Sequence, residues 1–244
     1  MDENIDQMVS QESHLEDLYA TGTTDTTIPN VNMRATDWLQ QAAERTRAVE
    51  GNTYVKLDHG ILTVDQINYL LNSMPMEITF ADDNNQFLYF NQRQDADSMY
   101  AMRQLEQVGN PLAACHPERV HKNVEAMIHQ LRTGHESLIR MYVPSHGDDK
   151  CVIHHYQAMK DTSGCYRGIN EYVMDIQPLI EYYLEQTGQL LIKNPNIDDV
   201  SGASKSQSHG IDAQTSASQK VAKSENHNES KHQVDVVTGA SKQK

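Results

Sequence analysis

The clearest periodic pattern in the sequence is an apolar stripe that predicts a helix over 117–133. Its apolar residues recur at the spacing of one α-helical face: Val120, Val124, Met127, Ile128 and Leu131. Pro117 suits a first helical turn, where its missing N–H costs nothing, and Gly134 is a typical stop signal. At about 100° per residue, His121 lies roughly 75° from the centre of the stripe. It is therefore a border residue that can face a cavity or solvent.

Three other segments have helical patterns. Apolar positions predict helices over 36–49, 62–73 and 177–193. Thr63 and Gln66 have the spacing of a capping box at the start of the second helix. Pro75 predicts its end, because the residue before a proline disfavours helical geometry. The residues between the first two helices, 55–60, read as a link, and 95–108 as short helical turns.

Runs of β-branched and aromatic residues, separated by turn residues, predict five strands. These runs are 76–81, 87–90, 136–144, 151–159 and 166–176. Two strands, a helical middle and three more strands predict an α+β fold, with a five-stranded antiparallel sheet and helices on one face. Such a sheet and its helices enclose a central cavity. Alternation in the fourth strand sends His154 and His155 to opposite faces, so they cannot jointly bind one metal.

Both ends of the chain are polar. Residues 1–57 read as an acidic arm with a short helix, and its first 33 residues lack core material. The folded domain with its flanking helices is expected over 58–193. Residues 194–244 carry mainly Ser, Lys, Gln, Asn and His. They cannot bury enough apolar surface to offset the entropy of ordering, so a disordered tail is predicted.

Composition excludes several classes of protein. The net charge of −14 disfavours binding to nucleic acid or to anionic membranes. Three cysteines and no visible secretory signal favour a reducing cytoplasm over a disulfide framework. No stretch approaches the roughly 20 apolar residues of a membrane span. The sequence also lacks the common nucleotide-binding, nucleophile and zinc-protease motifs, so no enzyme is predicted.

Three blocks in order resemble a bacterial PAS-like family that often follows a hemerythrin-like domain. The first block covers 60–67 and 74–82, the second contains Cys115-His116-Pro117 with His121, and the third lies within 160–175. The second block resembles the family signature Cys-His-Pro-Pro-x-x-x-His, except that Glu118 replaces the second proline. Glu77 also stands where the family usually has Asp. Residues 1–57 are too short for a four-helix iron bundle, so di-iron chemistry is not expected.

The resemblance implies a cytosolic sensory module without catalytic activity, with a ligand cavity between helix 117–133 and the sheet. Ligand or redox state would shift the flanking helices and alter contacts with a second copy or a protein partner. Glu171 would be costly to bury unless paired, and His121 or Arg140 are candidate partners. The residues expected at the ligand are Cys115, His116, His121, His155 and Glu171.

Two alternatives remain open at this point. Some PAS domains bind haem through a histidine on the long helix, which makes His121 a candidate iron ligand for a gas or redox sensor. A protein–protein adaptor that binds no ligand is the other alternative. The same residues also have plain structural roles: His116 can cap the helix, Cys115 can act as a small apolar residue, and His121 can bond a neighbouring strand.

Overall fold

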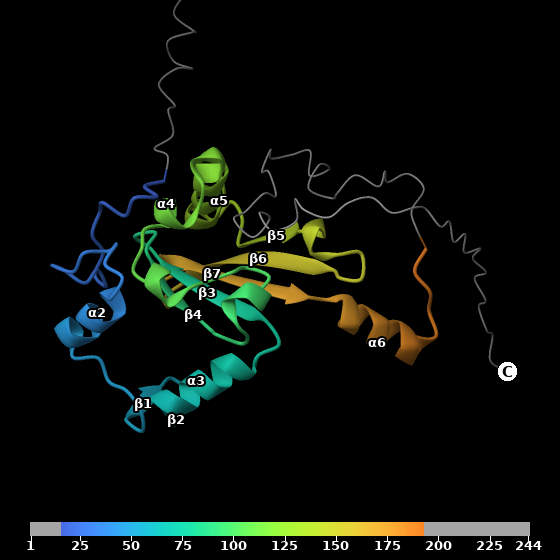
Figure 1. The fold of residues 1–244 in the computed structure, drawn as a ribbon, viewed down its shortest axis with the longest axis horizontal. Helices are drawn as coiled ribbons and strands as arrows, with labels where there is room; N and C mark the ends of the chain where they lie inside the picture. The colour runs from blue at the N-terminus through green and yellow to red at the C-terminus, as the bar shows by residue number, and fades with distance from the viewer. Residues whose placement is uncertain (1–15, 193–244) are drawn as a thin grey trace, which may run out of the picture.

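The centre of the structure is an antiparallel five-stranded sheet. The structure, a computed structural model, describes residues 16–192 of the 244-residue chain (Figure 1). The strands lie in the order β4-β3-β7-β6-β5, and every neighbouring pair is antiparallel. The predicted fold class is therefore confirmed. The strands are β3 (Glu77–Asp82), β4 (Phe87–Phe90), β5 (Leu138–Tyr142), β6 (Val152–Lys160) and β7 (Tyr166–Asp175).

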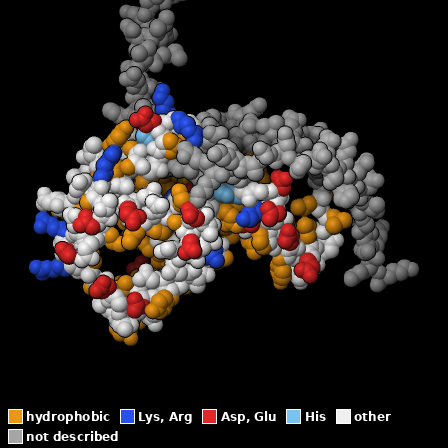
Figure 2. Space-filling model, in the orientation of Figure 1, with side chains coloured by type: hydrophobic (Ala, Val, Ile, Leu, Met, Phe, Trp, Pro, Cys, Tyr) orange, Lys and Arg blue, Asp and Glu red, His pale blue; other side chains and the backbone are white. Residues whose placement is uncertain are grey.

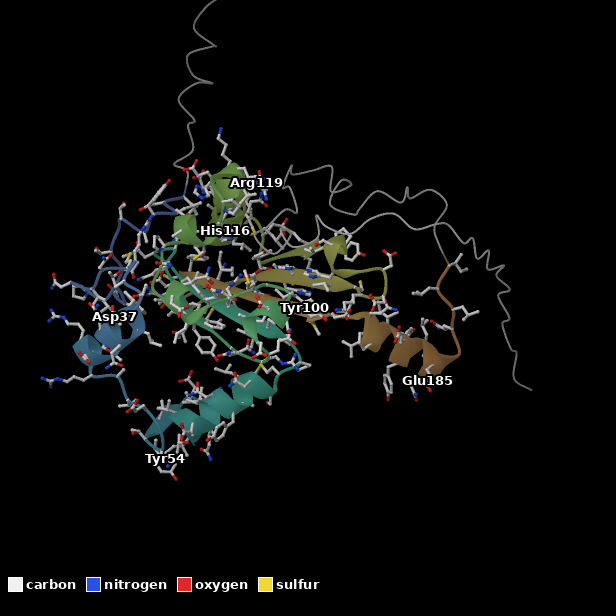
Figure 3. The ribbon with its side chains drawn as sticks, viewed as in Figure 1. Asp37, Tyr54, Tyr100, His116, Arg119 and Glu185 are labelled. Atoms are coloured by element: carbon white, nitrogen blue, oxygen red, sulfur yellow. The ribbon has the colours of Figure 1, made fainter. Side chains whose placement is uncertain are left out.

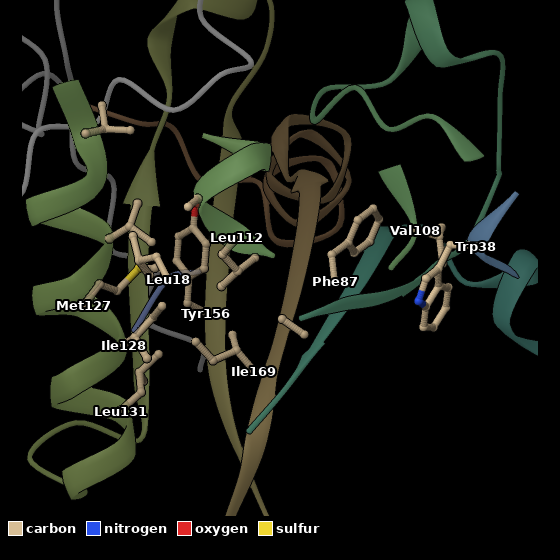
Figure 4. Packing of buried hydrophobic residues seen from close by; sticks show 14 of the residues in the cluster. Leu18, Trp38, Phe87, Val108, Leu112, Met127, Ile128, Leu131, Tyr156 and Ile169 are labelled. Atoms are coloured by element: carbon tan, nitrogen blue, oxygen red, sulfur yellow. The ribbon is translucent and has the colours of Figure 1, made fainter. Parts of the chain in front are cut away.

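Helix α5 (His121–Thr133) lies over one face of this sheet, which we call the inner face. Val124, Met127, Ile128 and Leu131 are buried beneath it, as their spacing predicts. Figure 4 shows Met127, Ile128 and Leu131 pointing from the helix towards Tyr156 and Ile169 of the sheet. The helix ends at Gly134, whose φ of 79° is the left-handed conformation that glycine adopts readily.

The long helix begins later than its sequence pattern predicts. Pro117 is extended, with φ −67° and ψ 143°, and Glu118–Val120 form the 3₁₀ turn η3 before α5 begins. The preceding stretch consists of short turns, as expected for 95–108. These elements are η1 (Ala96–Ser98), η2 (Leu105–Gln107) and α4 (Leu112–Cys115), while η4 (Pro144–His146) follows β5.

A buried carboxylate anchors this irregular stretch to the sheet. Glu77, at the start of β3, is 4% exposed and accepts the backbone N–H groups of Tyr100 (2.7 Å) and Ala101 (2.8 Å). Burial raises the pKa of Glu77, and these two hydrogen bonds partly offset the rise. The anchor fixes the backbone just ahead of Arg103, a residue that becomes important at the cavity.

The N-terminal segment differs from the sequence expectation, because residues 16–47 pack on the domain. Leu18 is 1% exposed, and its carbonyl accepts the N–H of Ala113 at the start of α4 (2.8 Å). The Asn84 and Asn85 side chains donate to backbone carbonyls of 17–22. Helix α2 (Trp38–Thr46) buries its Trp38 indole against Gly109, where any Cβ would collide with the ring. These contacts supply the burial that the local sequence alone does not indicate.

Two parts of the chain project from this body. One is the hairpin β1 (Tyr54–Leu57) and β2 (Gly60–Thr63) with helix α3 (Val64–Ser73); the hairpin lies where the sequence predicted a link. The predicted capping box of α3 is present, with Thr63 accepting from the Gln66 N–H and Gln66 from the Thr63 N–H. The other is helix α6 (Gln177–Thr187), which extends beyond the end of β7 (Figure 1).

Neither projecting helix buries a residue. Helices α3 and α6 contain no buried side chain at all, and α6 ends at Thr187, capped by Gly188, rather than near residue 193. Hydrophobic side chains are visible on the surface over α6 in Figure 2. The exposed large apolar residues of these parts are Tyr54, Leu57, Ile61, Tyr69, Leu70, Leu179, Tyr182 and Tyr183.

No helix within residues 16–192 has both the length and the apolar character needed to cross a membrane. The predicted disordered tail over 194–244 lies outside the described residues, as does the start of the predicted N-terminal arm.

Candidate ligand cavity

A partly open cavity of about 100 Å³ lies between the inner face of the sheet and the helices that cover it. Its walls come from three parts of the chain: strands β3, β4, β6 and β7, the irregular stretch ahead of α4, and helices α4 and α5. Most of the lining is apolar. The apolar lining residues are Ala81, Phe87, Met102, Leu112, Val124, Met127, Ile128 and Ile169.

One end of the cavity is polar and is organised by Glu171. This residue lies on β7 opposite Tyr156 of β6 and Thr79 of β3, both of which also line the cavity. Its Oε2 accepts a charged hydrogen bond from the Arg103 guanidinium at 2.7 Å, and its Oε1 accepts from His154 Nδ1 at 3.0 Å. The Arg103 and Glu171 side chains are only 18% and 11% exposed. The pair is therefore shielded from bulk water.

Glu171 is ionised because its hydrogen-bonded and charged partners lower its pKa by more than its burial raises it. Burial alone would raise the pKa of this carboxyl, but the Arg103 guanidinium and the His154 hydrogen bond lower it to about 2. Tyr156 also directs its hydroxyl to Glu171, and burial with this nearby negative charge keeps the pKa of the phenol well above its ordinary value. Glu171 is thus ionised and Tyr156 is neutral at physiological pH.

Cys115 and His116 line the cavity from the end of α4. His116 Nδ1 lies 2.9 Å from the Leu112 carbonyl, which can only accept, so Nδ1 carries the hydrogen and Nε2 keeps a lone pair. Loss of hydration lowers the pKa of His116, which keeps the ring neutral. Burial also raises the pKa of the Cys115 thiol to about 11, so the sulfur is protonated and is a poor nucleophile. Figure 3 shows His116 between the helices and the sheet.

The structure does not bring His121 and His155 to the cavity. His121 Nε2 donates to the His116 carbonyl at 3.0 Å, and its ring meets Tyr19 edge-on at 6.3 Å between centroids. His155 lies on the opposite face of the sheet, stacked on Tyr172 with 4.4 Å between centroids. Of the five expected ligand residues, Cys115, His116 and Glu171 therefore meet at the cavity.

Sequence reasoning missed the residues that pair with Glu171. Arg103 and His154 take the role that had been expected of His121 or Arg140. Arg103 comes from a stretch without regular periodicity, 68 residues from its partner, so no local signal identifies it. His154 could have been found, because alternation places it on the same strand face as Tyr156.

The arrangement does not fit a haem. His121 has its Nε2 engaged by a backbone carbonyl and does not line the cavity. Pockets for drug-sized ligands have about 300–1,000 Å³, and haem is at least as large, whereas this cavity has about 100 Å³. Within residues 16–192 no group of three or more His, Cys, Asp or Glu side chains is placed to hold a metal ion.

The sheet order and the cavity agree with a comparison of the sequence with known families. Residues 67–177 match the family described as PAS domain. These residues form a PAS domain. The match begins within α3 and ends at the start of α6, so it contains every residue that lines the cavity.

Several solved structures are similar to this chain. A C-terminal domain from Streptococcus mutans is 34% identical, covers 55% of this chain and 99% of its own, and superimposes with a TM-score of 0.51. The PAS domain of BvgS from Bordetella pertussis is 15% identical over 52% of this chain and 98% of its own, with a TM-score of 0.35. A PAS domain from Colwellia psychrerythraea is 12% identical over 47% and 98%, with a TM-score of 0.33. No curated protein matches the chain.

Proposed function

We propose that this chain is a sensory module whose PAS domain binds a small ligand and converts its presence into a change in protein–protein contact. PAS domain homologues are sensory modules in signalling proteins, and they are generally non-catalytic. The observation that carries the proposal is the cavity, which combines an apolar wall with an ionised, hydrogen-bonded group at one end. Apolar cavities with a few convergent polar groups are typical ligand sites.

The cavity favours binding over catalysis. A nucleophilic mechanism would need an activated group, but the Cys115 thiol is protonated. Both Glu171 oxygens accept hydrogen bonds, and the low pKa of Glu171 makes it a weak base. The same protonated thiol favours a ligand signal over a redox signal, because the thiolate is the readily oxidised form.

Strand β7 connects the cavity directly to a projecting helix. It carries Ile169 and Glu171 at the cavity and ends at Asp175, two residues before α6 begins. Asp175 Oδ1 accepts the N–H groups of Gln177 (3.0 Å) and Cys151 (2.9 Å), which ties the first turn of α6 to the start of β6. A ligand that moves Glu171 would therefore alter the base of α6 through one continuous strand.

The exposed apolar faces of α3 and α6 are the proposed output surface. Leu179 of α6 is 57% exposed and Tyr182 is 64% exposed, and Tyr69 of α3 is 67% exposed. Apolar side chains gathered on a helix with nothing buried mark an interaction site more often than a free surface. We infer that a second copy of the chain covers these faces, and a separate protein is the alternative that a monomeric chain would favour. An adaptor without a ligand would use the same faces, but it gives no role to the cavity.

Native mass spectrometry of the full chain tests ligand binding. We expect one small molecule per chain to remain bound to protein purified under native conditions. Cys115→Leu should remove it, because the longer side chain projects into the cavity. Cys165→Leu is the matched control, since Cys165 is exposed in the β6–β7 turn and does not line the cavity. A protein that carries no adduct, or an adduct that Cys115→Leu leaves in place, would contradict the proposal.

A further inference from the structure

We propose that the ligand of the cavity is a small uncharged molecule that carries a hydrogen-bond acceptor on an otherwise apolar body. This inference rests on the proposed function, because it names the class of molecule that the same cavity would bind. It follows from four properties of the lining: its volume, its charge balance, the hydrogen bonds that Glu171 already accepts, and the hydrogen-bonding groups that remain.

The volume limits the ligand to a few atoms. A cavity of about 150 Å³ accommodates benzene, which has six non-hydrogen atoms. The cavity of about 100 Å³ is smaller than that one, so it suits a molecule of at most about six non-hydrogen atoms. The apolar residues of α5, β3 and β7 that line it suit a hydrocarbon body of this size.

The ionisable groups of the lining already balance one another. Arg103 is positive and Glu171 is negative, while Cys115 and His116 are neutral at physiological pH. A charged ligand would bring a net charge next to an ion pair whose side chains are only 18% and 11% exposed, and burying an uncompensated charge is costly. An uncharged ligand avoids that cost.

Glu171 has little capacity left for a donor on the ligand. One oxygen accepts from Arg103 at 2.7 Å, and the other accepts from His154 at 3.0 Å. Tyr156 directs its hydroxyl to the same carboxylate. A carboxylate has about four acceptor positions, so these three partners leave about one for a donor on the ligand. A cationic ligand would also lie close to the positive Arg103 guanidinium, which would repel it.

Arg103, in contrast, has donors left. A guanidinium carries five N–H groups. In the described part of the chain, Arg103 uses its NH2 group for Glu171 and its NH1 group for the Met102 carbonyl at 3.1 Å. A carbonyl or similar acceptor on the ligand can accept a further N–H, and a hydrogen bond to a charged donor is stronger than a neutral one. The lone pair on His116 Nε2 can accept from an N–H or O–H of the same ligand group.

Four probes of the same shape but different charge test this inference. They are isobutyramide (uncharged with an acceptor), isobutyrate (an anion), isobutyramidinium (a cation) and 2,3-dimethylbut-1-ene (apolar). Dissociation constants for the full chain come from ¹H–¹³C methyl NMR titrations that follow Ile128 and Ile169, which line the cavity, with exposed Ile61 as the reference. We expect isobutyramide to bind at least about tenfold more tightly than either charged probe.

The hydrogen bond between Arg103 and an acceptor on the ligand is tested by comparing two arginine variants. Arg103→Met should weaken the binding of isobutyramide about tenfold, because it removes a charged donor, and should leave the affinity for the alkene unchanged. Arg167→Met is the matched control, because Arg167 is 45% exposed, pairs with Asp161 and does not line the cavity. The ranking of the four probes on the unmodified chain does not depend on whether Arg103→Met folds.

The possible results separate the two proposals. If isobutyrate or isobutyramidinium binds as tightly as isobutyramide, the charge argument is wrong and ligand binding stands. If the alkene binds as tightly as the amide, the inference that the ligand carries a hydrogen-bond acceptor is wrong. If none of the four probes shifts the signals of Ile128 or Ile169, the cavity does not admit a guest, and the proposed function fails together with the ligand class.

Discussion

The layer between α5 and the sheet and the projecting helices α3 and α6 use apolar residues in opposite ways. In the inner layer Ile128 and Leu131 are completely buried, whereas Leu179 and Tyr182 on α6 are more than half exposed. Both sets have amphipathic helical spacing. The difference is that the inner stripe has a sheet face opposite it within the same chain. Periodicity thus identifies a surface that will be covered, but it does not identify what covers it.

The polar groups differ in the same way. In the inner layer Arg103, His154 and Glu171 form a shielded network, while α6 has exposed acids such as Glu185 that face solvent. A buried network holds one geometry because each unpaired member would be costly. An exposed charge adds little to stability. The following predictions test this contrast, beginning with the largest expected loss of stability.

Glu171→Gln should lower the free energy of unfolding by about 3–5 kcal/mol, because it leaves the shielded Arg103 charge without its partner. Urea unfolding followed by circular dichroism measures the loss. Glu185→Gln is the control on exposed α6 and should change stability by less than about 0.5 kcal/mol. Equal effects of the two substitutions would remove the distinction between the inner network and the surface.

The same pair of proteins gives a pH dependence with a defined sign. The pKa of Glu171 is about 2 in the folded protein, below its ordinary value of 4.5, so its ionised form stabilises the fold above about pH 4.5. That contribution is lost as the pH falls from about 4.5 towards 2. The stability gap between the unmodified chain and Glu171→Gln should therefore shrink over this range and stay constant from pH 5 to 7. A gap independent of pH down to 2 would show that the charge of Glu171 is not what stabilises the fold.

Leu18→Ala should cost about 2–4 kcal/mol, because Leu18 is 1% exposed and packs in the main hydrophobic cluster. Tyr19→Ala is the neighbouring control, since Tyr19 is 55% exposed. The measurement is again the free energy of unfolding. If both substitutions are neutral, residues 16–22 are a detachable arm, as the sequence had indicated, and do not belong to the inner region.

These residues show where sequence reasoning succeeds and where it fails. The α5 stripe, the Gly134 stop and the Thr63–Gln66 capping box depend on neighbours within a few turns, and all three are confirmed. The burial of Leu18 depends on Asn85 and Ala113, far along the chain, and no local pattern encodes it. Arg103 was missed for the same reason. His121 was placed correctly at the border of the stripe, but the border faces the backbone of the turn before α5.

Substitutions on the projecting helices should alter self-association and leave stability unchanged, whereas substitutions in the inner layer lower stability. The double substitution Leu179→Ser and Tyr182→Ser should change the unfolding free energy per chain by less than about 0.5 kcal/mol, because both side chains are exposed. It should, however, abolish self-association in sedimentation velocity. Exposed Leu105 lies outside both projecting parts, so Leu105→Ser serves as the control. If the double variant associates as the unmodified chain does, α6 is not the interface.

The central claim is that occupancy of the cavity alters contacts made by the projecting helices. It is tested most directly by the dimer dissociation constant of the full chain, measured by sedimentation with and without saturating isobutyramide. Coupled sites change each other's affinity, typically by about 5- to 150-fold. We predict a change of at least about fivefold in the unmodified chain and none in Cys115→Leu. A dimer constant that is the same with and without isobutyramide, while the amide shifts the Ile128 and Ile169 signals, would contradict the account.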